Sequence, residues 1–386
     1  MDGNITSFAA MPDGGDVVIR FSTNKEWSAE LGKYSNAWAG IPQQLTGAAG
    51  TCEIGFTANP NIGQSSRTTT LIITAGRASV EIAITQDPVA IDLPDEDEVR
   101  AYLMRLYNDA GGAEWRWATK WGSDLPLSQW GPEVHYDNGK LELYLSDRDL
   151  KGNVNLSGCK ALVGLRCAKN QISEIDVSDC PLLKYIDATN VGLKKINLSG
   201  CLSLDNVSLP YNNLTDLDIG WSTTLRMLTV NDCNLRSLDL SRCLWLDDLS
   251  CQRNRISELK IPLRQKLSSL WCYANELTSL DLSNSPQLQL LNCGENELTE
   301  LNVKGCPRLD WIYCYDNRLK SVDVSDQKDV LEHYYCYSNQ LTELDLTGYR
   351  KLSELHCSDN KLTRLDITGC RNVRWLYCSY NQLEEL

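Results

Sequence analysis

The chain has 386 residues, of which 42% are hydrophobic, and its formal net charge is -14 at pH 7. A chain of this length can form two or three folded units that each bury an apolar core. The acidic charge argues against a nucleic-acid partner, because nucleic-acid recognition needs a basic face. No stretch has the length and apolar character of a transmembrane helix, so membrane insertion is not expected.

Residues 1–90 are predicted to form a small β-sandwich. Runs of alternating apolar residues have the pattern of half-buried strands, and Gly, Asn and Pro turns separate them. These runs are residues 16–23, 51–58, 68–75 and 78–86.

Several residues of this segment occur in a characteristic order: Trp27, Trp38, a turn from Gly47 to Gly50, Asn59, Arg67, Thr68, Thr85 and Gln86. On these residues the segment resembles the BACON domain, a module common at the front of Bacteroidetes surface proteins. The resemblance implies an exported protein, and the family's name implies carbohydrate binding. Trp27 and Trp38 also suit a role in the core, in which case the domain is a spacer.

Residues 91–140 are predicted to be a linker followed by an N-terminal cap. Pro94 and the acidic residues after it are typical of a helix start, and Gly111 and Gly112 stop the helix. The tryptophans that follow resemble the N-terminal cap of plant-type leucine-rich repeats without its paired cysteines: Trp115, Trp117, Trp121 and Trp130. Capping is favoured over ligand binding as their role, because Trp side chains bury much area against a first coil.

Residues 141–386 repeat a 21-residue unit, L-x-x-L-x-C-x-x-N-x-L-x-x-L-x-L-x-x-C-x-x. A degenerate coil comes first, and eleven units follow, with one extra residue before the ninth. Such a period predicts a solenoid in which each coil buries its apolar edge against its neighbours. The pattern resembles bacterial leucine-rich repeats with Cys. The first position of the units falls at Leu162, Leu183, Leu204, Leu225, Leu246, Leu267, Leu288, Leu309, Leu331, Leu352 and Val373.

Each position of the unit has a predicted role. The Leu and Cys of L-x-C are two residues apart, so both point inward from a short strand, and these strands stack into a parallel sheet on the concave face. The Asn is expected to bond backbone groups of the turn. Val191 and Cys233 replace it in two units, whose turns are expected to be looser. The second half of the unit is too short for a helix, which predicts extended or 3₁₀ segments on the convex side.

Sixteen cysteines occur in the chain, and the repeat accounts for most of them. They fill two inward positions, and Ala188, Leu209 and Val230 fill the first of these in other units. We therefore expect buried, reduced thiols that act as small hydrophobes, rather than disulfides or zinc ligands. No metal and no cofactor is predicted.

The sequence holds no phosphate-binding loop and no nucleophile elbow, and its only histidines are His135, His333 and His356. His333 and His356 are expected on neighbouring strands near Glu354, where a metal or an acid/base pair is geometrically possible. Two polar residues on an exposed sheet are the favoured interpretation, so the protein is predicted not to be an enzyme.

Aromatic residues gather at the outward strand positions of the later units. The early units, with residues such as Gly164 and Arg166, are expected to form an ordinary polar sheet. Outward aromatics are typical of binding hot spots and sugar-stacking platforms, although cross-strand aromatic ladders also stabilise sheets. Asp316, Glu354 and Asp359 border the set. The predicted binding residues on the concave face are Trp271, Tyr273, Leu290, Trp311, Tyr313, Tyr315, His333, Tyr335, Tyr337, His356, Trp375 and Tyr377.

Together these patterns predict a non-enzymatic recognition protein of the cell surface that binds a protein or peptide partner. A host or surface glycan, including mucin, and a purely structural spacer are the alternatives. The start MDGNITSFAA lacks the features of a signal peptide, whereas the BACON resemblance implies export, with an outer-membrane lipid anchor suspected. The sequence stops inside a repeat at Leu386, which predicts an open sheet edge at residues 375–377 that a further segment or a partner covers.

Overall fold

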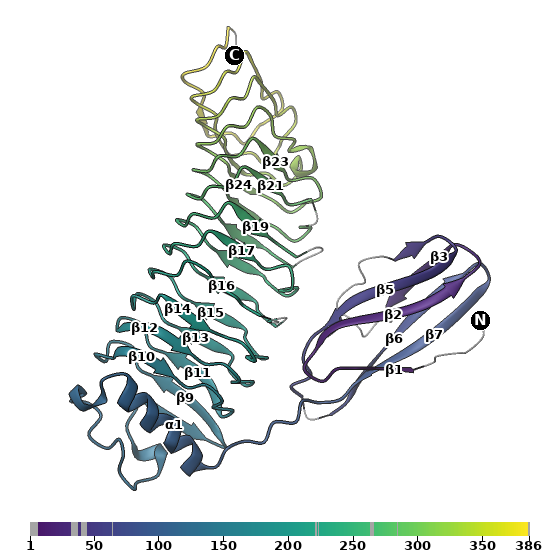
Figure 1. Cartoon of the computed structure of the whole chain (residues 1–386). Helices are drawn as coiled ribbons and strands as arrows, with labels where there is room; N and C mark the ends of the chain where they lie inside the picture. Colours follow the sequence, from purple (N-terminus) through teal and green to yellow (C-terminus); the bar gives the residue numbers. More distant parts are fainter. Residues whose placement is uncertain are drawn as a thin grey trace.

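The structure is a computed structural model that describes residues 7–31, 38–39, 45–63, 65–220, 222, 224–262, 266–283 and 285–384. Figure 1 shows a strand-rich N-terminal part and a long stack of coils, joined by an extended segment. That segment, residues 87–95, contains no helix or strand. Leu386, where the sequence stops inside a repeat, lies outside the described residues.

The described residues of the N-terminal part form seven strands in two sheets. One sheet has the order β1-β7-β6-β3-β4, and the other is the antiparallel pair β2–β5. Alternate residues of the strands, such as Leu71 and Ile73 of β6, are buried in one apolar core. The strands are β1 (Ser7–Ala10), β2 (Gly15–Thr23), β3 (Trp27–Leu31), β4 (Thr46–Gly47), β5 (Gly50–Ala58), β6 (Arg67–Ala75) and β7 (Ala78–Gln86).

The residues that carry the BACON resemblance hold this core together. Trp27 and Trp38 are each only 4% exposed. Gly47 lies against the Trp27 ring, where an added Cβ would stand 2.5 Å from Nε1. The Arg67 guanidinium lies 4.7 Å from the centroid of Trp38 and donates to Oε1 of Gln86 at 2.8 Å. Burial lowers the pKa of Arg67 to about 10. Both tryptophans therefore pack inside the fold and offer no open ring to a sugar.

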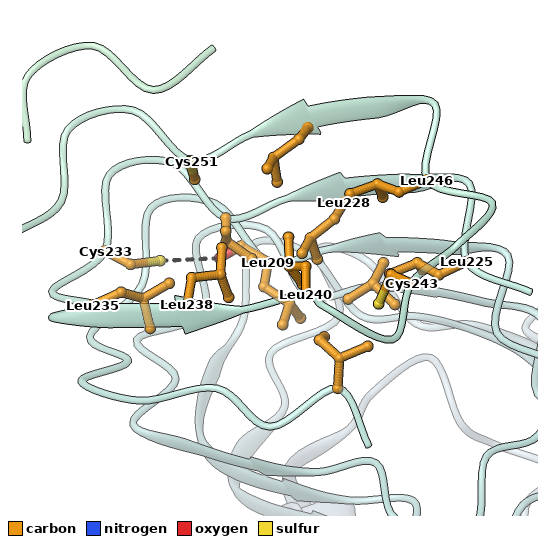
Figure 2. Packing of buried hydrophobic residues seen from close by; sticks show 14 of the residues in the cluster. Leu209, Leu225, Leu228, Cys233, Leu235, Leu238, Leu240, Cys243, Leu246 and Cys251 are labelled. Carbon is orange, nitrogen blue, oxygen red and sulfur yellow. Dashed lines mark hydrogen bonds between the residues drawn. The ribbon is translucent and has the colours of Figure 1, made fainter. Parts of the chain in front are cut away.

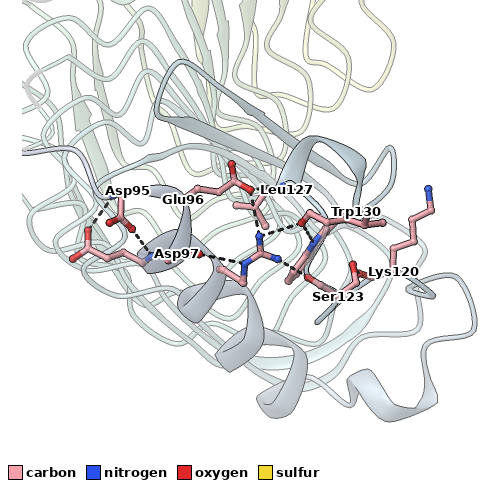
Figure 3. A network of polar contacts seen from close by, with 10 residues as sticks. Asp95, Glu96, Asp97, Lys120, Ser123, Leu127 and Trp130 are labelled. Carbon is pink, nitrogen blue, oxygen red and sulfur yellow. Dashed lines mark hydrogen bonds and ion pairs between the residues drawn. The ribbon is translucent and has the colours of Figure 1, made fainter.

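The next segment contains one helix, α1 (Glu96–Asp109), and two 3₁₀ turns, η2 (Gly112–Glu114) and η3 (Leu127–Gln129). A capping box starts α1, since Asp95 and Glu98 each accept a hydrogen bond from the other's backbone N–H. Arg100 pairs with Glu96 at 3.3 Å and donates to the Ser123 carbonyl at 2.6 Å (Figure 3). These polar contacts tie the helix to the loop that follows it.

Tryptophans of this segment pack against one another and against the first coils. Trp115, Trp121 and Trp130 are buried, and the Trp115 and Trp117 rings stack at 4.9 Å. All belong to the same apolar cluster as the solenoid core. The hairpin of β8 (Val134–Asp137) and β9 (Lys140–Tyr144) joins the solenoid sheet, so the sheet begins inside the segment predicted to be the cap.

The coils stack as a parallel solenoid, as the repeat predicts. Their first halves form a 13-stranded sheet in chain order, in which the pairs from β9 onward are parallel. Leu249, Leu270 and Leu291 are register partners, each 21 residues from the next. After β9 the strands are β11 (Leu162–Arg166), β13 (Tyr185–Asp187), β15 (Asn206–Ser208), β16 (Met227–Thr229), β18 (Asp248–Ser250), β20 (Ser269–Trp271), β22 (Leu290–Asn292), β24 (Trp311–Tyr313), β25 (His333–Tyr335), β27 (Glu354–His356) and β29 (Trp375–Tyr377).

The second halves of the coils are extended, which confirms the prediction for the convex side. Where the structure describes them, they form short parallel sheets and one 3₁₀ turn, η4 (Ser325–Gln327). No α-helix occurs among the described residues of the repeats. The strands are β10 (Lys151–Asn155), β12 (Gln171–Asp176), β14 (Lys195–Asn197), β17 (Ser237–Asp239), β19 (Glu258–Lys260), β21 (Ser279–Asp281), β23 (Glu300–Asn302), β26 (Glu343–Asp345) and β28 (Arg364–Asp366).

Leucine and cysteine columns fill the inside of the coils (Figure 2). All sixteen cysteines are free thiols, and all are buried except Cys52, Cys370 and Cys378, which are half-buried. Burial raises the pKa of Cys251, Cys314 and Cys357 to about 12. These thiols are therefore protonated at neutral pH.

The second cysteine position also makes hydrogen bonds, which the sequence interpretation as a packing position missed. The Sγ of Cys201 donates to the Val177 carbonyl of the preceding coil at 3.1 Å. Gln327 and Tyr349 stand at the same position in other coils and donate to the carbonyls of Val303 and Val324. Gln and Tyr replace Cys at this position in some coils, and this choice of hydrogen-bonding side chains could have indicated the bonds from the sequence.

The asparagine column links successive coils, as predicted. Asn275 donates from Nδ2 to the carbonyls of Cys251 and Cys272 at 3.1 and 3.0 Å. Its Oδ1 accepts from the Ile256 N–H at 2.9 Å. Each such side chain thus bonds backbone groups of its own coil and of the preceding one.

The two coils without asparagine keep the same turn, so the expectation of looser turns is wrong. Asn190 and Asp232, which precede Val191 and Cys233, have φ of 54° and 53°, within the 49° to 58° of the other coils. Their N–H groups each donate to the next coil at 3.0 Å, and these backbone bonds hold the turn. Cys233 Sγ also donates to the Leu209 carbonyl, where Figure 2 draws the bond.

Candidate functional site

The predicted binding residues lie on the outer face of the 13-stranded sheet, in three columns that follow from its register. In the first column Leu290, Trp311, His333, Glu354 and Trp375 are successive partners. The second column holds Trp271, Tyr313, Tyr335, His356 and Tyr377, and Asn292 stands after Trp271. The third column lies two residues further along each coil and holds Tyr273, Tyr315 and Tyr337.

Eight of these side chains form one connected set of rings, which we call the aromatic face. Trp311 and His333 lie 4.0 Å apart, measured between ring centroids, and Tyr315 stacks on Tyr337 at 4.9 Å with an interplanar angle of 6°. His356 lies 4.3 Å from Tyr337 and joins the second and third columns. The aromatic face consists of Trp311, Tyr313, Tyr315, His333, Tyr335, Tyr337, His356 and Tyr377.

Other predicted residues surround this set. Trp271 donates from Nε1 to the Ser269 hydroxyl at 3.0 Å, and the Tyr273 ring faces Arg253 at 5.8 Å. Leu290 is half-buried, whereas Trp375 is 49% exposed beside the aromatic face.

Gly294 lets the aromatic face extend toward the preceding coil. A Cβ added at Gly294 would stand only 2.6 Å from Cζ of Tyr315. The Tyr315 ring therefore lies directly over this glycine, while its hydroxyl approaches Glu295 at 3.5 Å. The sequence pattern did not indicate this contact.

The rings cover one another unequally. Tyr313, Tyr335, Tyr337, His333 and His356 are half-buried by their neighbours. Trp311 and Tyr377 are 37% and 47% exposed, at opposite ends of the set. The middle of the aromatic face is thus packed, and its ends present apolar ring area to solvent.

Glu354 is the only charged residue in the three columns between β20 and β29, apart from histidines. Its carboxylate lies 3.5 Å from Nδ1 of His333. Burial, together with a hydrogen bond to Glu354, raises the pKa of Tyr335. Burial lowers the pKa of His356, although Glu354 and Asp359 oppose this shift. The lowered pKa of His356 favours its uncharged form at neutral pH.

Within the described residues, no group of three or more His, Cys, Asp or Glu side chains is placed to hold a metal ion. His333 and Glu354 approach each other as a pair, whereas His356 packs against tyrosine rings. No helix in the described part of the chain is long and apolar enough to cross a membrane.

A second cluster, missed by the sequence interpretation, lies at the other end of the sheet. The Arg166 guanidinium sits 4.9 Å from the Tyr144 ring centroid and 4.5 Å from that of Tyr185. The Tyr144 hydroxyl donates to Glu142, and hydrogen bonds from Tyr144 and Tyr185 lower the pKa of Glu142. The expectation of an ordinary polar sheet around Gly164 and Arg166 is therefore wrong. Extending the repeat register into the degenerate coil would have aligned these outward tyrosines with Arg166.

Comparison with known proteins supports the fold. No protein-family model matches the chain, and no curated protein matches it. The functional domain of InlJ from Listeria monocytogenes, which includes a cysteine ladder, is 24% identical over 64% of this chain and 64% of that chain, with a TM-score of 0.53. The leucine-rich repeat domain of APL1 is 22% identical over 62% of this chain and 67% of that chain, with a TM-score of 0.52.

At these identities the likeness concerns the fold alone. The matches agree with the stacked parallel strands and the inward leucine columns described above. The coils of this chain therefore adopt the solenoid fold of leucine-rich-repeat proteins.

Proposed function

We propose that this protein is a non-enzymatic recognition protein whose aromatic face binds a protein or peptide partner. The observation that carries the proposal is the connected set of eight rings on an outward sheet face. Tyr and Trp are enriched at the energetic centres of protein interfaces, where they combine apolar area with a polar group. The fold shared with leucine-rich-repeat proteins supports a partner of this kind.

Sheet stabilisation alone accounts poorly for the position of these rings. A cross-strand aromatic pair contributes about 0.2–1 kcal/mol, and this gain is available on every strand of the sheet. The strands from β15 to β18 instead carry Asn, Ser, Met, Thr and Asp at their outward positions. Concentration of the rings on β24 to β29, with exposed Trp311 and Trp375 at its margins, favours a binding role.

A glycan is the second candidate ligand. Trp311 and Trp375 expose ring area on either side of Glu354, and a sugar ring can stack on such a surface while its hydroxyls bond a carboxylate. The BACON resemblance of residues 1–90 adds support for a location at the cell surface, which we also propose. If the protein were only a structural spacer, its aromatic face would bind no ligand.

The proposal is tested by panning a displayed peptide library, and separately a glycan and mucin array, against the intact chain and a Trp311→Ala/Tyr377→Ala variant. Met227→Ala is the matched control, because Met227 is 41% exposed on the same sheet face, away from the rings. Peptides that bind the intact chain and the control but not the double variant would support the proposal. Circular dichroism melts confirm that all three proteins are folded.

Two results would count against a protein partner. If only glycans bind, and the double variant loses this binding, the ligand of the aromatic face is a sugar. Binding that the double variant retains would place the ligand elsewhere on the molecule.

A further inference from the structure

Carboxylates line both borders of the aromatic face. Asp310 and Glu332 directly precede the outward strand residues on one border. Glu295, Asp316 and Asp359 follow the third column on the other border, and each of these has φ near +50°. Burial raises the pKa of Asp310 and the charge of Glu332 adds to this shift, whereas His333 and Lys351 oppose it. Arg374 is the one basic residue at the border positions on β24 to β29.

Basic residues approach some of these acidic side chains without forming ion pairs with them, as Lys351 does at Asp310 and Arg253 at Glu295. Among the described residues, neither Glu354 nor any of the five border carboxylates forms an ion pair with a lysine or an arginine. Elsewhere on the solenoid such pairs do form, for example between Glu297 and Arg318 at 3.3 Å. The negative charge around the aromatic face is therefore available to an external cation.

Glu354 has capacity for another donor. An ionised carboxylate can accept about four hydrogen bonds. Tyr335 supplies one of these hydrogen bonds. The 3.5 Å contact with His333 supplies none, because Nδ1 of His333 is buried with no hydrogen-bond partner. The Glu354 side chain is 20% exposed, so a ligand can reach it from the solvent side.

The rings beside Glu354 suit a planar cation. Trp375 is the register partner of Glu354 and makes no ring contact with the aromatic face among the described residues. Elsewhere in this chain, arginine side chains lie over aromatic rings: Arg67 over Trp38 and Arg166 over Tyr185. No lysine or arginine of the described residues lies over a ring of the aromatic face.

We propose that the aromatic face recognises an arginine side chain in an extended segment of its protein partner, with Glu354 as the counter-ion and the adjacent Trp375 ring stacked on the guanidinium. This inference rests on the proposed function and specifies its partner. Arginine suits the position better than lysine, because its planar fork can bond a carboxylate through two N–H groups while stacking on an aromatic ring. The border carboxylates then attract further basic residues of the same segment.

The experiment measures binding of the peptide Ac-GSRGSRG-NH2 by isothermal titration calorimetry at low salt. Its citrulline counterpart keeps the shape of the side chain and removes the charge. We expect the arginine peptide to bind at least about tenfold more tightly than the citrulline peptide, and to weaken as salt is added. Glu354→Gln should lower the affinity for the arginine peptide by about tenfold or more.

Glu343→Gln is the matched control, because Glu343 is an exposed strand residue of the preceding coil half, on the opposite sheet, and forms no ion pair among the described residues. It should leave the affinity unchanged. Equal binding of the arginine and citrulline peptides, unchanged binding to the Glu354→Gln variant, or no binding of the arginine peptide would overturn the inference.

The library selection separates this inference from the proposed function. If selected peptides require Trp311 and Tyr377 but contain no basic residue, the aromatic face is a protein-binding site and the arginine proposal fails. If the selected peptides bind without these rings, both the proposed function and the arginine proposal fail.

Discussion

Replacing Asn275 with Ala is a quantitative test of the asparagine column. Asn275 is 8% exposed and makes four hydrogen bonds to backbone groups, of which the one to the Tyr273 carbonyl is the longest at 3.4 Å. The carbonyls of Cys251 and Cys272 also accept from Asn254 and Asn296, so each keeps one partner in the variant. The Ile256 N–H, in contrast, has no other partner among the described residues.

These partners set the expected magnitude. An unsatisfied buried N–H costs about 1–3 kcal/mol, and each weakened carbonyl adds about 0.5–1.5 kcal/mol. We expect Asn275→Ala to lower the free energy of unfolding of the solenoid by about 3 kcal/mol. Asn372→Ala, the control, removes one exposed side-chain hydrogen bond and should cost about 0.5 kcal/mol or less.

Urea unfolding followed by tryptophan fluorescence measures the total effect, and hydrogen exchange with mass spectrometry locates it. The peptide containing Ile256 should lose protection in Asn275→Ala but not in Asn372→Ala. An Asn275→Ala protein with the same urea midpoint and the same exchange at Ile256 would refute the argument that this side chain holds the two coils together.

Ala274→Gly should raise the unfolding free energy by about 0.5–1 kcal/mol, because Ala274 has φ +54°, where a Cβ is unfavourable; a lower urea midpoint would contradict this. Tyr334→Phe should stabilise by about 1 kcal/mol or less, since the fully buried hydroxyl meets only the thiols of Cys314 and Cys336, which are weak hydrogen-bond partners, and a loss of thermal stability would argue against that account. The raised pKa values of Cys251, Cys314 and Cys357, about 12 against an ordinary 9, mean that the folded state binds their protons more tightly than the unfolded state. Their stabilising contribution is present below pH 9 and is lost as the pH rises toward 12, so urea midpoints should fall between pH 8 and pH 10.5; a constant midpoint would contradict this.

The 21-residue period alone predicted the stacked coils, the inward leucines and cysteines and the asparagine bonds. Repetition determines these features, because residues one period apart must take equivalent places in successive coils. It also predicted the columns to which Trp311, Tyr335 and Tyr377 belong, since period and strand alternation together decide which residues share a face.

The contacts between side chains needed the tertiary structure. Tyr315 lies over Gly294, and Arg166 lies between Tyr144 and Tyr185, because rotamers and neighbouring coils direct those side chains along the sheet. Trp27 and Trp38 were equally compatible with a core and with a sugar site until their burial was known. Spacing along the chain decides the face on which a residue lies, whereas packing against residues distant in sequence decides which groups it touches and how far solvent can reach it.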